Sequence, residues 1–357
     1  MTDLPRPGRR SLLAMLSTLP ATVRAGTLWA ASPSAVTAPF AESPRLFVAG
    51  PSDGTLNRWA DALLPALQQS LPADTPIHRV GIGSADGVTG ANQFEARGAP
   101  DGLTAMLAPG QAALAWMVGD PRAQFDVAHW VPVMAGMSTG MVVGRPTVLK
   151  PGGRARVAAA SPASADLAAL LGLHLLGTKM EPVFGLAWPE SARSAFSQGA
   201  VDAVLLRGHG VPEQFTALAA VGAQPLFSFG ALDDAGQVTR DAAYPAVPNF
   251  TELYAARIGR IPSDSLCNAW SAAAAATQLE FGLVLPQLTP AAMVSLWRRA
   301  GVDAVASLGV QATAATVDVR PLGGPAATAN TAALAANAPA LQELRHWLAS
   351  RFDWRPA

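Results

Sequence analysis

Short apolar runs that end at a small-residue loop and lead into a helical pattern recur along this chain. The first run, Leu46–Ala49, ends at the tight loop 50–54. Apolar residues that include Trp59 then recur at three- and four-residue spacing as far as Leu71, which is typical of one buried helix face. This unit predicts a buried strand, a loop and a helix in that order.

The second unit repeats the order. Residues 77–82 alternate weakly as a strand, and the glycine-rich stretch 81–90 opens a helix over 91–97. A further strand is expected at 103–108, after the turn at Pro100. The repeated order predicts an α/β fold with mostly parallel sheets and helices on their faces.

A chain of 357 residues suits two domains of ordinary size. We expect Met141–Gly144 to be the strand that leaves the first domain, because Pro146 and the linker-like stretch 151–153 follow it. A second set of elements is then expected, with strands at 157–160, near Val183 and at 203–206, and helices at 165–176 and 190–198. The predicted domains are residues 45–146 with 265–357, and residues 147–264.

The last part of the chain divides into an expected loop and an expected helix. Residues 322–340 are rich in Gly, Ala, Thr and Asn, and this low complexity predicts a loop. Leu341, Leu344, Leu348 and Phe352 then share one face of a C-terminal helix.

The composition excludes several function classes. The formal net charge is zero, with no basic block that would bind nucleic acid. The single cysteine, Cys267, rules out a disulfide or a cysteine-built metal site within the chain, and the five histidines lack metal-ligand spacing. No cofactor is expected.

The N-terminal segment is typical of a signal peptide. Arg6, Arg9 and Arg10 precede an apolar run over 11–21, and small residues at the expected positions predict cleavage after Ala25. The pair of arginines before Ser-Leu-Leu also suits twin-arginine export, and Sec export remains open. Residues 26–44 are expected to be flexible, and the mature protein to be soluble in the periplasm.

Several motifs in consistent order resemble the substrate-binding proteins of tripartite tricarboxylate transporters, the Bug family. Ala96-Arg-Gly-Ala-Pro-Asp-Gly-Leu-Thr104 matches the family's "A-R-A-A-P-D-G-Y-T" nearly residue for residue. Residues 130–133, 196–202 and 244–252 resemble three further family motifs. The resemblance implies a two-domain, periplasmic-binding-protein-like fold with a ligand cleft. It also implies a small-carboxylate ligand, membrane permease subunits as partners, and no enzymatic activity.

A carboxylate in such a cleft needs fixed donors, which backbone N–H groups at helix N-termini provide. The loops 50–55 and 83–89 follow adjacent predicted strands and suit this role. Residues 160–164, which lack the family's glycines, and 184–188 are expected to face them. The predicted ligand-binding residues are Pro51, Ser52, Asp53, Gly54, Thr55, Ser84, Asp86, Gly87, Thr89, Gly110, Ser161, Ser164 and Trp188. On this basis, a bulky side chain in place of Gly87 should abolish binding.

Three alternatives stay open at this stage. Asp53 and Asp86 either cap helices or select a ligand that bears a donor, and Trp188 is either structural or covers the ligand. The two G-x-S-x-G motifs, at Ser52 and Ser138, satisfy the hydrolase pattern, but no convincing partner histidine accompanies them. A monomeric binding protein that docks on a sensor ectodomain, and never feeds a transporter, is the remaining alternative.

Overall fold

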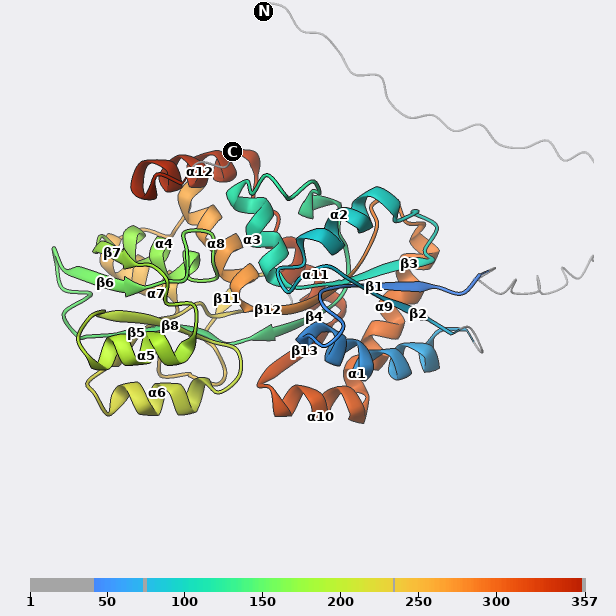
Figure 1. The fold of residues 1–357 in the computed structure, drawn as a ribbon, viewed down its shortest axis with the longest axis horizontal. Coiled ribbons are helices and arrows are strands. Elements are labelled where there is room, and N and C mark those ends of the chain that lie inside the picture. Colours follow the sequence, from blue (N-terminus) through green and yellow to red (C-terminus); the bar gives the residue numbers. More distant parts are fainter. Residues whose placement is uncertain (1–41, 73–75, 234, 355–357) are drawn as a thin grey trace, which may run out of the picture. The chain divides into compact units, whose positions relative to one another are not determined.

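A computed structural model describes residues 42–72, 76–233 and 235–354. The predicted signal peptide, residues 1–25, and most of the predicted flexible segment 26–44 lie outside these ranges. The strands form two large sheets, a six-stranded sheet in the order β13-β4-β12-β3-β1-β2 and a five-stranded sheet in the order β7-β6-β8-β5-β9 (Figure 1). We call the six-stranded sheet, with the helices packed on it, the first lobe. The five-stranded sheet and its helices form the second lobe.

The strands of the first lobe are β1 (Arg45–Ala49), β2 (His78–Ile82), β3 (Thr104–Ala108), β4 (Val131–Ser138), β12 (Leu279–Leu285) and β13 (Val319–Gly323). Those of the second lobe are β5 (Gly140–Gly144), β6 (Arg154–Ala158), β7 (Lys179–Val183), β8 (Ala203–Arg207) and β9 (Gln224–Ser228), beside the short hairpin β10 (Ala231–Leu232) and β11 (Val238–Thr239).

The two sheets are mixed, whereas mostly parallel sheets were expected. The predicted strand–loop–helix units do pair in parallel, β1 with β2 and β3, and β6 with β7 and β8. Within the two large sheets, the antiparallel pairs all involve β4, β5 or β12, the strands next to the points where the chain passes between lobes. A strand that enters from the other lobe needs no helical crossover, so it can run antiparallel to its neighbours.

The chain passes from the first lobe to the second at Thr139, between β4 and β5. The strand predicted at Met141–Gly144 therefore pairs with β8 and β9 in the second lobe. The linker-like stretch at 146–153 forms turns between β5 and β6, inside that lobe. The crossing thus precedes the predicted boundary at residue 146.

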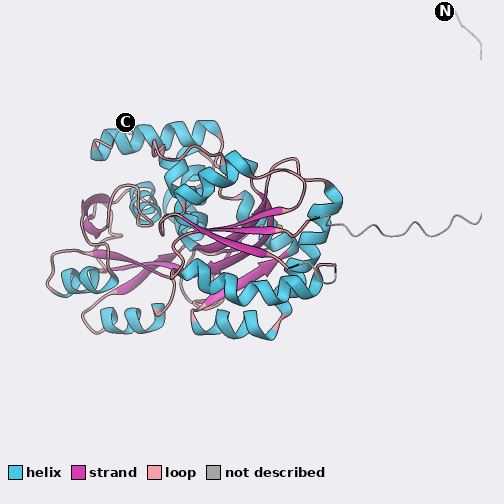
Figure 2. Cartoon of the chain, turned by 45° about the vertical axis from the view of Figure 1, so that its right-hand side comes forward, coloured by secondary structure: helices cyan, strands magenta, loops and turns pink. Residues whose placement is uncertain are grey.

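Helices cover both faces of the sheets (Figure 2). In the first lobe they are α1 (Thr55–Ser70), α2 (Val88–Arg97), α3 (Gly110–Val118), α9 (Ala291–Ala306), α10 (Leu308–Thr316) and α11 (Gly324–Ala332), with the 3₁₀ turn η1 (Val127–His129). In the second lobe they are α4 (Leu167–Leu175), α5 (Pro189–Ser197), α6 (Val211–Ala219) and α7 (Phe250–Ile258). The predicted helix after β1 is α1, which continues through Pro65.

Helix α8 (Ser265–Gln278) packs against helices of both lobes. Its five consecutive alanines, Ala272–Ala276, are all buried, and these small side chains let neighbouring backbones approach closely. On the second lobe, Trp270 Nε1 donates to the Ala168 carbonyl at 3.0 Å, and Thr277 Oγ1 donates to the Ala165 carbonyl at 2.9 Å. Cys267 is also buried in α8, and burial raises the pKa of its thiol to about 11.

The expectation of a loop over 322–340 is wrong. This segment holds the end of β13, all of α11 and the start of α12 (Ala338–Phe352). Pro325 occupies the first turn of α11, where its missing N–H costs nothing, and the alanines that follow are strong helix formers.

The C-terminal helix α12 contacts both lobes. It packs on α8 and on α3 of the first lobe. Its Trp347 lies 5.5 Å from the ring of His174 in α4, and Phe352 lies 5.8 Å from the ring of Phe184 in the second lobe. Together with α8, it joins the two lobes into one continuous hydrophobic cluster.

Candidate functional site

One cavity collects the C-terminal ends of strands from both lobes. Its volume is about 430 Å³. The first lobe contributes the loop after β1, the loop before α2 and the start of α3, while the second lobe contributes Ala165 and Arg207. The lining residues are Gly50, Pro51, Gly54, Thr55, Leu56, Ala85, Asp86, Pro109, Gly110, Gln111, Leu114, Ala165, Arg207, Ala276, Thr277, Leu279 and Glu280. The cavity therefore lies between the lobes, where a ligand can contact both.

Two helices present uncapped N-termini to this cavity. Neither Gly54 before α1 nor Pro109 before α3 offers a side-chain cap, and neither first turn holds an acidic residue. The backbone N–H groups of Thr55 and Leu56 in α1, and of Gly110 and Gln111 in α3, donate no hydrogen bond within the part that the structure describes. Such groups, with the positive end of the helix dipole, favour a negatively charged ligand.

Gly110 lines the cavity, and close packing between helices also requires a glycine at this position. A Cβ atom there would lie 1.9 Å from the carbonyl oxygen of Ala276 in α8. Only glycine allows α3 and α8 to approach this closely. The start of α3 is thereby fixed against the helix that links the lobes.

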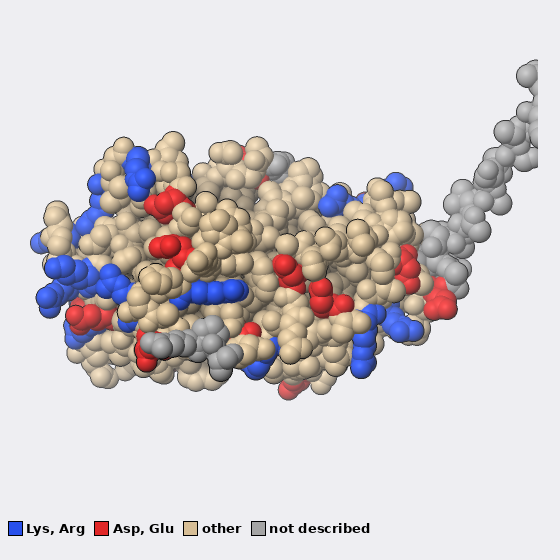
Figure 3. All heavy atoms as spheres, turned by 90° about the horizontal axis from the view of Figure 1, so that it is seen from above, with Lys and Arg blue, Asp and Glu red and all other residues tan. Residues whose placement is uncertain are grey.

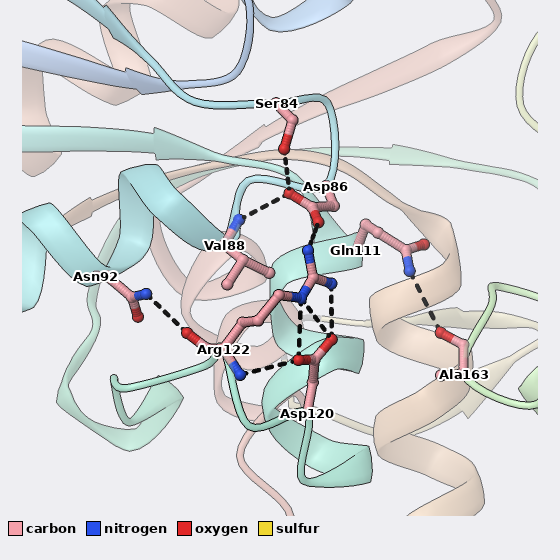
Figure 4. Close-up of polar contacts among 8 residues, drawn as sticks. All are labelled: Ser84, Asp86, Val88, Asn92, Gln111, Asp120, Arg122 and Ala163. Atoms are coloured by element: carbon pink, nitrogen blue, oxygen red, sulfur yellow. Dashed lines mark hydrogen bonds and ion pairs between the residues drawn. The ribbon is translucent and has the colours of Figure 1, made fainter. Parts of the chain in front are cut away.

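Asp86 is engaged by its own lobe and does not stand as a free anion. Its carboxylate accepts hydrogen bonds from Ser84 Oγ at 2.8 Å and from Val88 N at 3.2 Å (Figure 4). Arg122 pairs with it at 2.9 Å while also binding Asp120, and these two carboxylates raise the pKa of the guanidinium. Asp86 thus accepts from the first N–H group of α2, although Gly87 is the residue at the N-cap position of that helix.

On the second lobe a carboxylate of the chain itself occupies the loop after β6. Asp166 accepts from Ala160 N at 2.9 Å and lies 2.8 Å from Ser164 Oγ. Burial raises the pKa of this carboxyl, while the Ala160 N–H and the Ser164 hydroxyl act in the opposite direction. The serine that was expected to bind a ligand is therefore already engaged.

The lobes also meet directly beside the cavity. Gln111 Nε2 of α3 donates to the carbonyl oxygen of Ala163, in the loop after β6, at 3.3 Å (Figure 4). A single long hydrogen bond between side chain and backbone is a weak link. Outside the cavity the lobes are joined again, because Asp318 beside β13 accepts a hydrogen bond from Gly210 N and lies 3.2 Å from His209 Nδ1.

Arg207 and Glu280 are the charged residues of the lining that sequence reasoning missed. Arg207, at the end of β8, is exposed, and its side chain makes no hydrogen bond or ion pair with the residues that the structure describes, although its charge acts on the buried Asp166 carboxyl and partly offsets the rise in pKa that burial causes there. Glu280, on β12, accepts from Ser138 Oγ at 3.2 Å. Arg207 could have been found, because it directly follows the strand predicted at 203–206, the same criterion that selected the loops after β1 and β2.

The predicted residues divide by position. Pro51, Gly54, Thr55, Asp86 and Gly110 line the cavity. The other predicted residues lie outside the lining. They are Ser52 and Asp53 on the exposed side of the first loop; Ser84, Gly87 and Thr89 around the start of α2; Ser161 and Ser164 in the loop after β6; and Trp188, which is 75% exposed before α5.

A second cavity, of about 350 Å³, shares no lining residue with the first. It is lined largely by apolar side chains around the β10–β11 hairpin, α8 and β13. None of the predicted ligand-binding residues contributes to it. The uncapped helix ends and the unpaired arginine make the first cavity the candidate site.

Comparison with solved structures identifies the fold. A TctC solute-binding protein from Polaromonas, solved without ligand, superposes with a TM-score of 0.64 at 16% identity, over 87% of this chain and 99% of that one. The chain has the fold of the TctC solute-binding proteins. The resemblance drawn from the sequence motifs is thus confirmed at the level of the fold.

Two further matches are looser. They are MatC from Rhodopseudomonas palustris with bound malate, at a TM-score of 0.45 and 18% identity over 86% of this chain and 97% of that one, and the periplasmic binding protein BugD, at 0.44 and 14% over 88% and 97%. No family model matches the chain. A search of curated protein sequences finds no significant match.

On this TctC-type fold, neither G-x-S-x-G motif has the geometry of a nucleophile elbow. Ser138 is buried on β4, with Oγ 3.2 Å from both the Gln278 carbonyl and Glu280 Oε1. Ser52 is exposed, and within the described ranges no histidine hydrogen-bonds to either serine. In those ranges, no group of three His, Cys, Asp or Glu residues could hold a metal ion.

Proposed function

We propose that this chain is a periplasmic solute-binding protein that captures a small carboxylate between its lobes and delivers it to a membrane transporter. One observation carries the proposal: two uncapped helix N-termini and an unpaired arginine line the same cavity. Each of these groups attracts an anion, and they come from opposite lobes. A bound carboxylate would therefore hold the lobes together.

The charge distribution on the surface favours recognition of the ligand by local contacts in the cleft, and not attraction of the ligand by a broad electrostatic field. Acidic and basic side chains are sparse and interspersed on the face drawn in Figure 3, and the formal net charge is zero. Without a field of one sign to concentrate anions, the cleft must select its ligand by geometry. Within the described ranges, no helix combines the length and apolar character needed to cross a bilayer. In this proposal the protein acts as a monomer and catalyses no reaction.

Calorimetry with a panel of di- and tricarboxylates, aromatic acids and amino acids tests the proposal. At least one carboxylate should bind the wild-type protein, and Arg207→Gln should weaken it by about tenfold or more, because hydrogen bonds to charged groups contribute about 1.5–3 kcal/mol. Arg299→Gln, an exposed arginine on α9 away from the cavity, is the matched control and should bind as wild type. If no carboxylate binds, or if Arg207→Gln changes nothing, the proposal fails.

A further inference from the structure

Two opposite charges lie unpaired in the candidate cavity. An ideal Cβ atom on Gly208 would lie 3.2 Å from Glu280 Oε1, so the Glu280 carboxylate sits against the residue that follows Arg207. Nevertheless, Arg207 and Glu280 form no ion pair with each other. The cavity lining thus holds one guanidinium, whose charge also acts on the buried Asp166 carboxyl, and one carboxylate, and neither of them is in an ion pair.

The remaining charge in the lining is already neutralised. Asp86 is paired with Arg122 and capped by backbone and hydroxyl donors. The free charges that a ligand meets are therefore one guanidinium and one carboxylate. A ligand with carboxylates at both ends would place negative charge beside Glu280, and like charges that share a site repel.

Glu280 is also held in place. Ser138 Oγ lies 3.2 Å from Glu280 Oε1, and Ser138 itself is buried where the chain leaves the first lobe. This contact occupies one carboxylate oxygen and leaves the other free. A fixed, partly exposed carboxylate is a suitable partner for a protonated amine.

We propose that the ligand is an amino carboxylate, with its carboxylate bound by Arg207 and the helix N-termini and its protonated amine bound by Glu280. This inference rests on the proposed function of the cleft. It makes Glu280 the residue that separates amino acids from dicarboxylates.

Matched ligand pairs test the inference by calorimetry. Each pair has the same number of methylene groups and differs only at one end: succinate with β-alanine, glutarate with 4-aminobutanoate, and adipate with 5-aminopentanoate. In at least one pair the amino member should bind the wild-type protein about tenfold more tightly. In Glu280→Gln the amino member should weaken by a similar factor, while the matched dicarboxylate should tighten because a repulsion is removed.

The control variant is Glu343→Gln, an exposed acidic residue on α12, which should keep the wild-type preference. Arg207→Gln should weaken both members of a pair together. If the dicarboxylates bind wild type as tightly as their amino partners, the inference fails and the proposed function stands. If no carboxylate from the pairs or the wider panel binds, both fail. The wild-type comparison decides the matter even if Glu280→Gln does not fold.

Discussion

At the scale of single residues, Gly87 lies in a loop that was predicted to bind ligand, but its glycine is needed for the backbone conformation and packing of that loop. It precedes α2 with φ of +74°, and a Cβ atom there would lie 2.5 Å from Pro109 Cδ. Gly87 does not line the cavity. A larger residue at this position therefore strains the fold before it meets any ligand, which corrects the expectation that it would block ligand approach.

Gly87→Ala should lower the free energy of unfolding by more than Gly177→Ala. Gly177 has a similar φ of +77°, but its added Cβ would meet nothing within 4 Å. Gly177→Ala should cost only the left-handed backbone penalty of about 1–2 kcal/mol. Chemical denaturation of both variants measures the difference, and equal losses would show that the contact with Pro109 is unimportant.

Sequence reasoning pointed to loops that line the candidate site but not to Arg207 or Glu280. The loops after β1 and β2 were predicted because glycine and small residues follow apolar runs, and parts of both line the cavity. The apolar pattern that predicts the strand at 203–206 does not include Arg207, the residue that follows it. Glu280 could not have been predicted, because its place beside Gly208 depends on two strands from distant parts of the chain.

At the scale of elements, Asp202 links the strands β6 and β8, which share only a short stretch of backbone pairing. β6 and β8 share one registered pair, Val157 with Ala203. Beside it, the Asp202 carboxylate accepts two hydrogen bonds from the Arg156 guanidinium and one from its backbone N–H, each at 2.9 Å. The Arg156 side chain chiefly holds the pKa of Asp202 below its ordinary value of 3.8.

Asp202→Asn should destabilise the protein at neutral pH. Because the folded-state pKa is lowered, the carboxylate stabilises the fold above 3.8, and this contribution is lost as the pH falls through the folded-state value. Melting temperatures should therefore differ most near neutral pH and converge in acid. Asp303→Asn, at an exposed position on α9, should follow wild type throughout. A constant difference at all pH values would contradict the assignment.

The C-terminal helix should matter to the stability of both lobes. Leu344 on α12 is fully buried, so Leu344→Ala should lower the free energy of unfolding by about 2–5 kcal/mol. Leu308, which is 89% exposed, provides the control, and Leu308→Ala should stay within about 0.5 kcal/mol of wild type. Denaturant unfolding measures both, and a small effect at Leu344 would mean that α12 is only loosely attached.

The elements were predicted well where the pattern is local. The apolar runs and helix faces of β1, α1, β3 and α4 appear close to their predicted positions. The sheet to which β5 belongs could not be read locally, since a buried apolar strand fits either sheet equally well. Helix α11 was missed because its alanines were grouped with glycine and asparagine as low complexity, although alanine is the strongest helix former.

At the scale of the whole molecule, export gives a further prediction. If residues 1–25 act as a signal peptide, protein from the periplasm should begin at Gly26, and N-terminal sequencing checks this. Replacing both Arg9 and Arg10 with lysine should stop export by the twin-arginine route and leave Sec export intact. Recovery of an intact Met1 from the cytoplasm would contradict the predicted location.

The buried cysteine of α8 makes this protein convenient for single-molecule optics. Cys267 is the sole cysteine of the chain, and its buried thiol, with a pKa of about 11, stays protonated and shielded from dyes at neutral pH. Cysteines introduced at the exposed positions Leu308 and Ser197, one on each lobe, would therefore accept donor and acceptor fluorophores without background labelling. The efficiency of energy transfer between the two fluorophores would then report any change in the separation of the lobes when a ligand binds.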